Sequence, residues 1–520
     1  MPLPENNTAW PPPQYAAELQ DMRIDDAWYS GDRTKLRTVY ALQGYDHAAA
    51  SNGIRDDRGR PWRFWERPRP VGARDGRLHV PLAEDIAATS AALLFSEPPT
   101  FTFELTETQD RWQEIADESG LNNILREAAE VSAALGGVCL RTTWNKDLAK
   151  RPLPTAVHAD GVLPEYQFGV LTGITLWREV ARNGGTVLRH LERHEPGVVL
   201  HGLYEGTLDN LGQRVPLTED TTTEPIAAEL DADGPGDTIT TGVKGLACVY
   251  IPNIRPNRKH RGSMLGRSDW QSDGIRDHFM SLDEVYTSWM RDIRLAKSRI
   301  IAPEQFLTDL GPGKGAHFDD DQDVWTGIKA PPTGGEGLTL NQFTIRVDEH
   351  ERSWNALTRQ AVQAAGYSAQ SFGLGDTTAV TATEVVARER KSMILRDQKS
   401  GYWLPELGAF AEAMLQMDTV LGFSRVTVER PRIQFGDSVS EDPKSVAETI
   451  SLLAQAQAIS TEAKVRMRNP ELDDTAVREE TDRILKETGQ MVNDPTETGA
   501  EGPGAPGFGR KAGGEQPKGA

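Results

Sequence analysis

The chain has 520 residues, with 57 basic and 77 acidic side chains and a formal net charge of −20. An acidic surplus of this size excludes a protein whose whole surface binds nucleic-acid phosphates, so any contact with DNA is expected to be local and weak. The length predicts roughly two to four domains or one elongated subunit of several parts.

Cys139 and Cys248 are the two cysteines, and their spacing supports neither a disulfide framework nor a thiolate metal site. The first residues, MPLPENNTAWPPPQY, lack the basic and apolar regions of a signal peptide. Nowhere do about eighteen apolar residues run together, as a bilayer span requires. We therefore expect a non-secreted chain that stays in a reducing compartment and does not enter a membrane.

The N-terminal segments predict an arm followed by an α+β domain. Residues 1–13 read as an arm, and the next segment as an amphipathic helix stopped by Gly31. A short strand from Leu78 and a helix that begins near Pro81 and ends before Pro98 follow. One more helix is predicted over 111–135. After it, VCLRTTW, GVLTGITLWREV and TVLRHLERHE alternate like antiparallel strands, which completes an α+β domain over 78–250.

Two segments of this region have more than one interpretation. Residues 61–70, PWRFWERPRP, interleave arginine with aromatic residues, as in a stacking platform for nucleic acid or in a contact surface of arginine on aromatic rings. Residues 205–240 are rich in Asp, Thr and Gly and predict a solvated surface loop. Their acidic residues do not follow the order of ligands in a calcium-binding EF-hand loop.

A long helix is predicted from Ser268 to Ile300. Its apolar residues alternate by four and three positions, which places them in one stripe: Ile275, Phe279, Leu282, Tyr286, Trp289, Ile293, Ala296 and Ile300. Ser268 and Gln271 resemble a capping box at its start.

The end of this helix carries a basic ridge, Arg291, Arg294, Lys297 and Arg299. The ridge complements the helix dipole and has two possible roles, to line a channel for DNA or to form salt bridges with acids of a neighbouring helix.

A second striped helix is predicted over 346–366, with Gly366 as its C-terminal cap. His350 lies in its stripe and is expected to pack there, because no other His or Cys keeps metal-ligand spacing with it. Between the two helices, residues 301–345 are rich in Gly, Pro and Asp around short strand-like pieces.

Residues 370–380 form a Gly/Thr loop without a phosphate-binding signature, because neither the GxGxxG spacing nor the GxxxxGK[ST] lysine is present. Thr381 and Glu384 then make a capping box for a helix that Pro405 is expected to kink. Beyond it, Trp403, Leu407, Phe410, Met414, Met417 and Leu421 form a new apolar stripe. Strands over 425–435, a helical group to 492 and a disordered Gly/Pro-rich tail complete the chain.

Four segments together resemble the portal proteins of tailed bacteriophages, of the Gp6-like type found with siphovirus-like heads. They are residues 79–99, 266–304, 372–394 and 432–472, in the order of that family. The resemblance implies an α+β, mostly helical portal fold. Its parts would be an arm and wing (1–267), a stem helix (268–300), a clip (301–345), a second stem helix (346–369), a tunnel loop (370–380), a kinked helix with wing return strands (381–436), a crown (437–492) and a disordered tail (493–520).

The resemblance also implies a function without catalysis, cofactor or metal. Twelve subunits typically form a ring at the unique capsid vertex, through which double-stranded DNA is packaged and later ejected. The DNA-facing tunnel-loop residues would be Ser371, Phe372, Gly373, Leu374, Gly375, Asp376, Thr377 and Thr378. Implied partners are the major capsid protein, a scaffold, the large terminase subunit and a head-tail adaptor, with assembly in the host cytoplasm and a final place in the virion.

Two other classes of function stay open at this stage. The twelve Trp residues and many carboxylates also suit a carbohydrate-active hydrolase with an Asp/Glu pair, although no pair stands out. Long helices alone also suit another head-assembly component, a scaffold or minor capsid protein.

Overall fold

A computed structural model describes residues 3–42, 77–230, 236–296, 345–374, 382–436, 443–469 and 474–488, with short strands at 299–301, 308–309, 316–317 and 339–341. It divides into two units, Met1–Ser438 and Val439–Ala520. About 51% of the described residues are helical and 21% are in strands, which confirms the α+β class. The predicted tail over 493–520 and the aromatic and basic segment at 61–70 lie outside the described residues.

Glycines end three of the described helices of the N-terminal half. Helix α1 (Pro13–Ser30) stops at Gly31, as predicted, and α2 (Arg33–Leu42) follows. Helix α3 (Leu82–Phe95) carries Glu84 and Asp85 in its first turn, but the residues before it form no strand. The single helix predicted over 111–135 is wrong, because Gly120 adopts a left-handed conformation that separates α4 (Thr106–Ser119) from α5 (Leu121–Leu135).

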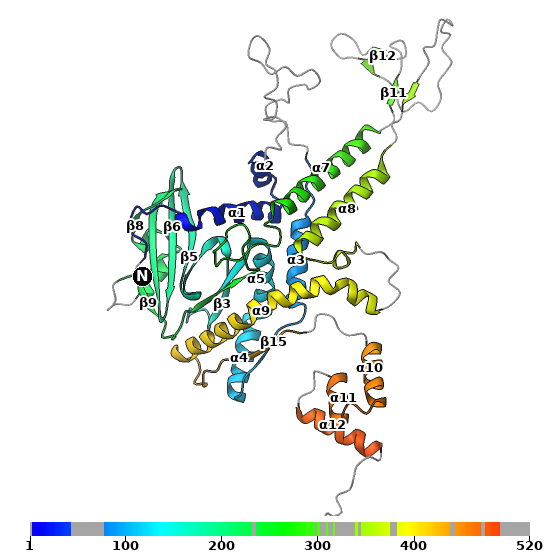
Figure 1. Ribbon diagram of the computed structural model, residues 1–520. Coiled ribbons are helices and arrows are strands. Elements are labelled where there is room, and N and C mark those ends of the chain that lie inside the picture. Colours follow the sequence, from blue (N-terminus) through cyan, green and yellow to red (C-terminus); the bar gives the residue numbers. More distant parts are fainter. Residues whose placement is uncertain are drawn as a thin grey trace, which may run out of the picture. The chain divides into compact units, whose positions relative to one another are not determined.

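Two antiparallel sheets follow (Figure 1). The larger has the order β4-β5-β6-β7-β8, with β9 added to β7. The three-stranded sheet has the order β10-β2-β3, and its central strand begins directly after α5. The strands are β2 (Gly137–Thr143), β3 (Leu153–His158), β4 (Val162–Gln167), β5 (Val170–Asn183), β6 (Thr186–Glu195), β7 (Val198–Thr207), β8 (Asn210–Val215), β9 (Thr238–Thr240) and β10 (Cys248–Pro252).

The surface loop predicted over 205–240 is wrong for most of its length. The segment contains the end of β7, all of β8, a 3-10 turn at Leu217–Glu219, helix α6 (Glu224–Glu229) and β9. The polar composition of the segment concealed β8, in which Leu211 and Gly212 are buried and Gln213 and Arg214 are exposed. The strand pairs with β7 through a register shift after Glu205.

Helices α7 (Asp273–Leu295) and α8 (Val347–Ala365) run side by side (Figure 1). Gly366 caps α8 as predicted. The predicted start of α7 at Ser268 and its end at Ile300 are both wrong: Ser272 precedes the first turn, and Arg299–Ile301 forms strand β11 with β14 (Thr339–Asn341). Strands β12 (Thr308–Asp309) and β13 (Ala316–His317) pair within the insert.

Helix α9 (Ala382–Val420) continues through Pro405 without interruption. Its predicted apolar stripe is confirmed from Trp403 to Met417, where each member is at most 1% exposed, and it contacts α3 and β10. Of the strands predicted over 425–435, the structure has β15 (Arg432–Gln434), which pairs with β1 (Thr100–Thr102).

The second unit is helical, as predicted. Helices α10 (Pro443–Gln455), α11 (Thr461–Arg468) and α12 (Asp474–Glu487) make it up within the described residues. The Ser460 hydroxyl caps α11 by accepting a hydrogen bond from the Ala463 amide. None of the described helices combines the length and the apolar character that crossing a bilayer requires.

Candidate functional site, the two-helix projection and the loop at its base

The contact between α7 and α8 is aromatic and ionic. Tyr286 packs on Trp354, with ring centroids 5.5 Å apart, and Trp289 stacks on His350 at 6.0 Å. Asp292 of α7 accepts a hydrogen bond from His350 Nε2 at 2.9 Å. The predicted packing role of His350 is therefore confirmed.

Arg346, which precedes the first residue of α8, donates from Nη2 to the same Asp292 carboxylate at 2.8 Å. The hydrogen bonds from His350 and Arg346 lower the pKa of Asp292 below its ordinary value. The Asp292 carboxylate of α7 thus joins the start of α8 to α7.

Burial changes along α7. Ile275, Phe279 and Leu282 are buried near its start, whereas Ile293 near its end is 42% exposed. Val347, at the start of α8, is 43% exposed. The two helices therefore carry exposed apolar side chains at the end that lies away from the packed body (Figure 1).

A buried ionic cluster ties the start of α7 to α1. Arg276 donates to Asp25 Oδ1 at 2.6 and 3.0 Å and to Asp21 at 3.3 Å. Burial raises the pKa of Asp25 to about 6, against the opposing effect of the Arg276 guanidinium. Ser268, the predicted helix cap, instead donates its hydroxyl to Asp25 at 2.7 Å, which explains why α7 begins later than its sequence suggests.

A second carboxylate of α7 holds the segment before α3. Asp283 is fully buried and accepts hydrogen bonds from the Tyr40 hydroxyl at 2.5 Å and the Val80 amide at 2.7 Å, and lies 3.0 Å from His79 Nδ1. The segment that begins at Leu78, for which the sequence predicts a strand, is therefore held by a side chain about two hundred residues further along the chain.

A third network joins α9 to the bases of both helices of the projection. Lys399 Nζ lies 2.8 Å from each oxygen of Asp269, 2.6 Å from Ser90 Oγ and 3.1 Å from the Tyr367 hydroxyl. Asp269 precedes α7, and Tyr367 follows α8. Burial lowers the pKa of Lys399, while the Asp269 carboxylate opposes that effect.

The first half of the predicted tunnel loop is held against this base. Ser371 and Phe372 end a short 3-10 helix (Ala369–Phe372), and Gly373 follows in a left-handed conformation. Ser371 Oγ lies 2.9 Å from Ser392 Oγ of α9, and Arg359 of α8 donates to the Leu374 carbonyl at 3.2 Å. The other half, Gly375, Asp376, Thr377 and Thr378, lies outside the described residues.

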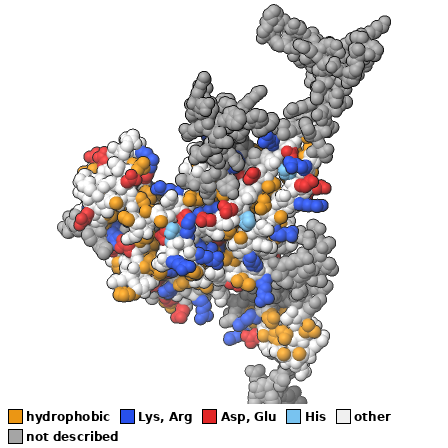
Figure 2. Space-filling model, turned by 45° about the horizontal axis from the view of Figure 1, so that its top comes forward, with side chains coloured by type: hydrophobic (Ala, Val, Ile, Leu, Met, Phe, Trp, Pro, Cys, Tyr) orange, Lys and Arg blue, Asp and Glu red, His pale blue; other side chains and the backbone are white. Residues whose placement is uncertain are grey.

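The structure describes one side chain of the predicted basic ridge. Arg291 is exposed on α7. The side chains of Arg294 and Arg299 and the whole of Lys297 lie outside the described residues, so both roles for the ridge stay predictions. Figure 2 shows basic and acidic side chains interspersed over the described part of one face, rather than a single basic surface.

Sequence reasoning missed the buried charges that anchor the projection. A signal was present in α1, where Asp21, Asp25 and Trp28 are spaced by four and three and so share one helix face. Carboxylates on the face that carries a buried Trp require buried cations, but the partner Arg276 lies about 250 residues away.

No family model matches the chain, and no curated protein does. Solved structures of gene transfer agent (GTA) particles do contain similar chains. One, from the neck of an empty GTA particle computed with C6 symmetry, is 13% identical with a TM-score of 0.40, over 75% of this chain and 90% of that chain.

Two further matches come from the same kind of particle. A chain of the virion of native GTA is 13% identical with a TM-score of 0.39, over 75% of this chain and 91% of that one. A chain of the native neck computed with C12 symmetry is 12% identical with a TM-score of 0.37, over 77% and 89%. At these identities and TM-scores, the matches do not show the function of this chain.

Proposed function

We propose that the chain is the subunit of a portal, a ring at one vertex of a phage-like capsid through which double-stranded DNA is packaged and ejected. The observation that carries the proposal is the α7–α8 pair. Two helices project together from a body that holds them with two buried ion-pair networks and with the hydrogen bonds to Asp283, and their outer ends leave Ile293 and Val347 exposed. A ring of copies would cover these side chains, because a contact between different faces of neighbouring subunits closes when the rotation permits.

The loop at the base supports the same function. Its first half is fixed to α8 and α9 by Ser371 and Leu374, so it holds a set position relative to the helices. We propose that residues 371–378 face the channel, where a polar loop makes weak contact with sliding DNA. Strong phosphate binding would resist sliding, and a chain of net charge −20 avoids it.

In this proposal the protein is not an enzyme, and the packaging motor supplies the energy. The ring would have twelve copies and would meet the large terminase subunit and later a head-tail adaptor at the insert between α7 and α8. The sequence resemblance to Gp6-like portal proteins supports these assignments. The major capsid protein and a scaffold would surround the ring during assembly in the host cytoplasm.

Three of the tryptophans favour the portal over a carbohydrate-active hydrolase. Trp289 and Trp354 pack between α7 and α8, and Trp403 is 1% exposed against Phe95, with ring centroids 5.0 Å apart. Indoles used for packing are not free to stack on sugar rings. For another head component, the long helices alone would suffice, but the order of the four resembling segments favours the portal.

Assembly is the first test of the proposal. Sedimentation and negative-stain imaging of the purified full chain should find rings with a central hole. Ile293→Asp with Val347→Asp should shift the population to monomers, because a charge buried in an interface is costly. Leu148→Asp, at a position 76% exposed in the body, is the matched control and should leave rings intact. A wild-type chain that stays monomeric under all assembly conditions contradicts the proposal.

Packaging tests the loop separately. Replacing Asp376, Thr377 and Thr378 with bulky basic residues should leave the rings intact but reduce the amount of DNA packaged, since added phosphate contacts oppose sliding. Packaging at the wild-type level in these variants would contradict a channel-facing position.

A further inference from the structure

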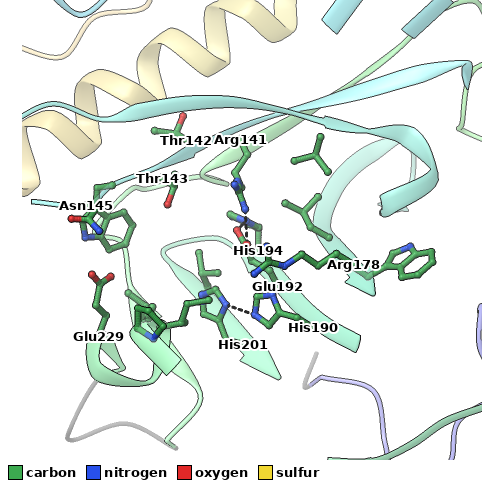
Figure 3. A pocket seen from close by; sticks show the side chains of 18 residues that line it. Arg141, Thr142, Thr143, Asn145, Arg178, His190, Glu192, His194, His201 and Glu229 are labelled. Carbon is green, nitrogen blue, oxygen red and sulfur yellow. Dashed lines mark hydrogen bonds and ion pairs between the residues drawn. The ribbon is translucent and has the colours of Figure 1, made fainter. Parts of the chain in front are cut away.

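A cavity of about 410 Å³ opens in the N-terminal half, remote in sequence from the two-helix projection. Its floor is one face of β5, β6 and β7, its roof is β2 and the residues that follow it, and α6 closes one side (Figure 3). Three alternate residues of β6, His190, Glu192 and His194, point into it because a strand turns every second side chain to the same face. A volume of this size is within the range of small-molecule sites.

The glutamate at the centre of the floor is fully engaged. Arg141 Nη1 donates to Glu192 Oε2 at 2.7 Å, and His194 Nε2 lies 2.7 Å from Oε1. Although burial acts to raise the pKa of Glu192, the hydrogen bond from His194 and the Arg141 guanidinium hold it well below its usual range. Glu192 is therefore held as an ionised carboxylate, with a partner at 2.7 Å on each of its oxygens.

Beside it, two buried imidazoles stack at a centroid distance of 5.3 Å and share one hydrogen bond. His190 Nε2 lies 3.2 Å from His201 Nδ1, and the two side chains are 4% and 6% exposed. Burial lowers the pKa of each to about 4, so both rings are neutral at pH 7. Within the described part of the chain, His190 Nδ1 and His201 Nε2 have no hydrogen-bond partner.

The shared bond fixes what the pair offers to a ligand. A neutral imidazole has one N–H and one acceptor nitrogen. If His190 donates to His201, then His190 Nδ1 is left as an acceptor and His201 Nε2 as a donor; if the bond reverses, both roles reverse. In either state the pair presents one donor and one acceptor. A hydroxyl group satisfies either state because it both donates and accepts.

The rest of the lining suits an uncharged ligand. The charged lining residues are two arginines, Arg141 and Arg178, and two glutamates, Glu192 and Glu229. The Thr143 hydroxyl and the half-buried ring of Trp144 add a polar group and an apolar face. A molecule with hydroxyls at its edge and C–H groups on its face matches this combination.

We propose that this cavity binds an uncharged polyhydroxylated small molecule, a saccharide or cyclic polyol, through the His190–His201 pair and Thr143. The site binds without hydrolysing. Glycoside hydrolysis uses two carboxylates. Of the two glutamates in the described lining, Glu192 is bound by Arg141 and His194, so Glu229 alone is left.

Calorimetric titration and saturation-transfer NMR of the full chain at pH 7 test the proposal. The neutral probes are maltose, trehalose and myo-inositol, and the comparison probes are inorganic phosphate and adenosine. At least one neutral probe should bind with a dissociation constant of about 1 mM or tighter. Failure of all three neutral probes, or tighter binding of phosphate or adenosine, overturns the proposal.

Two variants place the binding in the cavity. Thr143→Val, which keeps the side-chain shape, should weaken the neutral probe about three- to tenfold, and His201→Phe should abolish its binding. Thr186→Val changes an exposed threonine of the same strand that supplies the floor and should bind as wild type does. If His201→Phe does not fold, Thr143→Val decides, and an unchanged affinity in that variant overturns the proposal.

Discussion

Lys399 offers the sharpest test of how the base of the projection is held. Its ammonium is fully enclosed, with side-chain exposures of 2% for Lys399 and 0% for Asp269. Replacing Lys399 with Met keeps an unbranched side chain that is one heavy atom shorter and removes the charge. Asp269 would keep hydrogen bonds from the Tyr367 hydroxyl at 2.6 Å and Asn253 Nδ2 at 2.8 Å, yet it would lose its cation.

The expected loss is large because a buried carboxylate without its cation is costly. Removing one partner of a buried ion pair reduces the free energy of unfolding by about 3–5 kcal/mol. Asp269→Asn added to Lys399→Met removes the stranded charge while keeping the amide able to pair with Tyr367 and Asn253. The double variant should therefore recover about 2 kcal/mol or more relative to Lys399→Met alone.

The measurement is urea unfolding followed by tryptophan fluorescence and circular dichroism at pH 7, with Lys146→Met as a control at an exposed lysine. That control should change stability by less than about 0.5 kcal/mol. A loss below about 1 kcal/mol in Lys399→Met, or a double variant no more stable than the single one, would refute the view that this ion pair is buried and coupled.

Three further predictions follow from local geometry. His190 and His201 have pKa values of about 4 in the folded chain, below the ordinary value, so the unfolded state binds more protons between these values and the free energy of unfolding falls as the pH drops. At pH 5 each histidine should lower the free energy of unfolding by about 2 kcal/mol relative to neutral pH. His201→Gln should flatten the pH profile of the urea midpoints, and an unchanged profile would argue that the histidines are not buried in the neutral form. Phe168 is 99% exposed and has a φ of +52°, which Asn adopts more readily than Phe, so Phe168→Asn should raise the free energy of unfolding of the monomer by about 0.5 kcal/mol. A lower free energy of unfolding in this variant would mean that the ring makes contacts. A Cβ on Gly266 would lie 2.1 Å from a backbone carbonyl oxygen, so Gly266→Ala should lower the free energy of urea unfolding by about 1–3 kcal/mol. Gly401, within α9, has open space around it, so Gly401→Ala should cost nothing. Equal effects of the two substitutions would contradict the close approach of the backbone to Gly266.

Local pattern was sufficient for the elements whose signal lies within a few turns of chain. The cap at Gly366, the acidic first turn of α3 and the apolar stripe from Trp403 to Met417 depend on residues three or four positions apart, and all three were predicted correctly. Where a local signal competed with a distant partner, the prediction failed. Ser268 is of a residue type that often caps helices, but its hydroxyl donates a hydrogen bond to Asp25, and α7 starts after Ser272.

For the candidate site, the sequence determined that two striped helices flank an insert and that a Gly/Thr loop follows them. It also placed Tyr286, Trp289, His350 and Trp354 on the faces that pack. The tertiary structure alone decided what fixes those helices to the body. The reason is physical: periodicity is written in neighbouring residues, whereas a buried charge is stable only beside a partner that the fold brings from far along the chain, as it brings Asp269 to Lys399 across 130 positions.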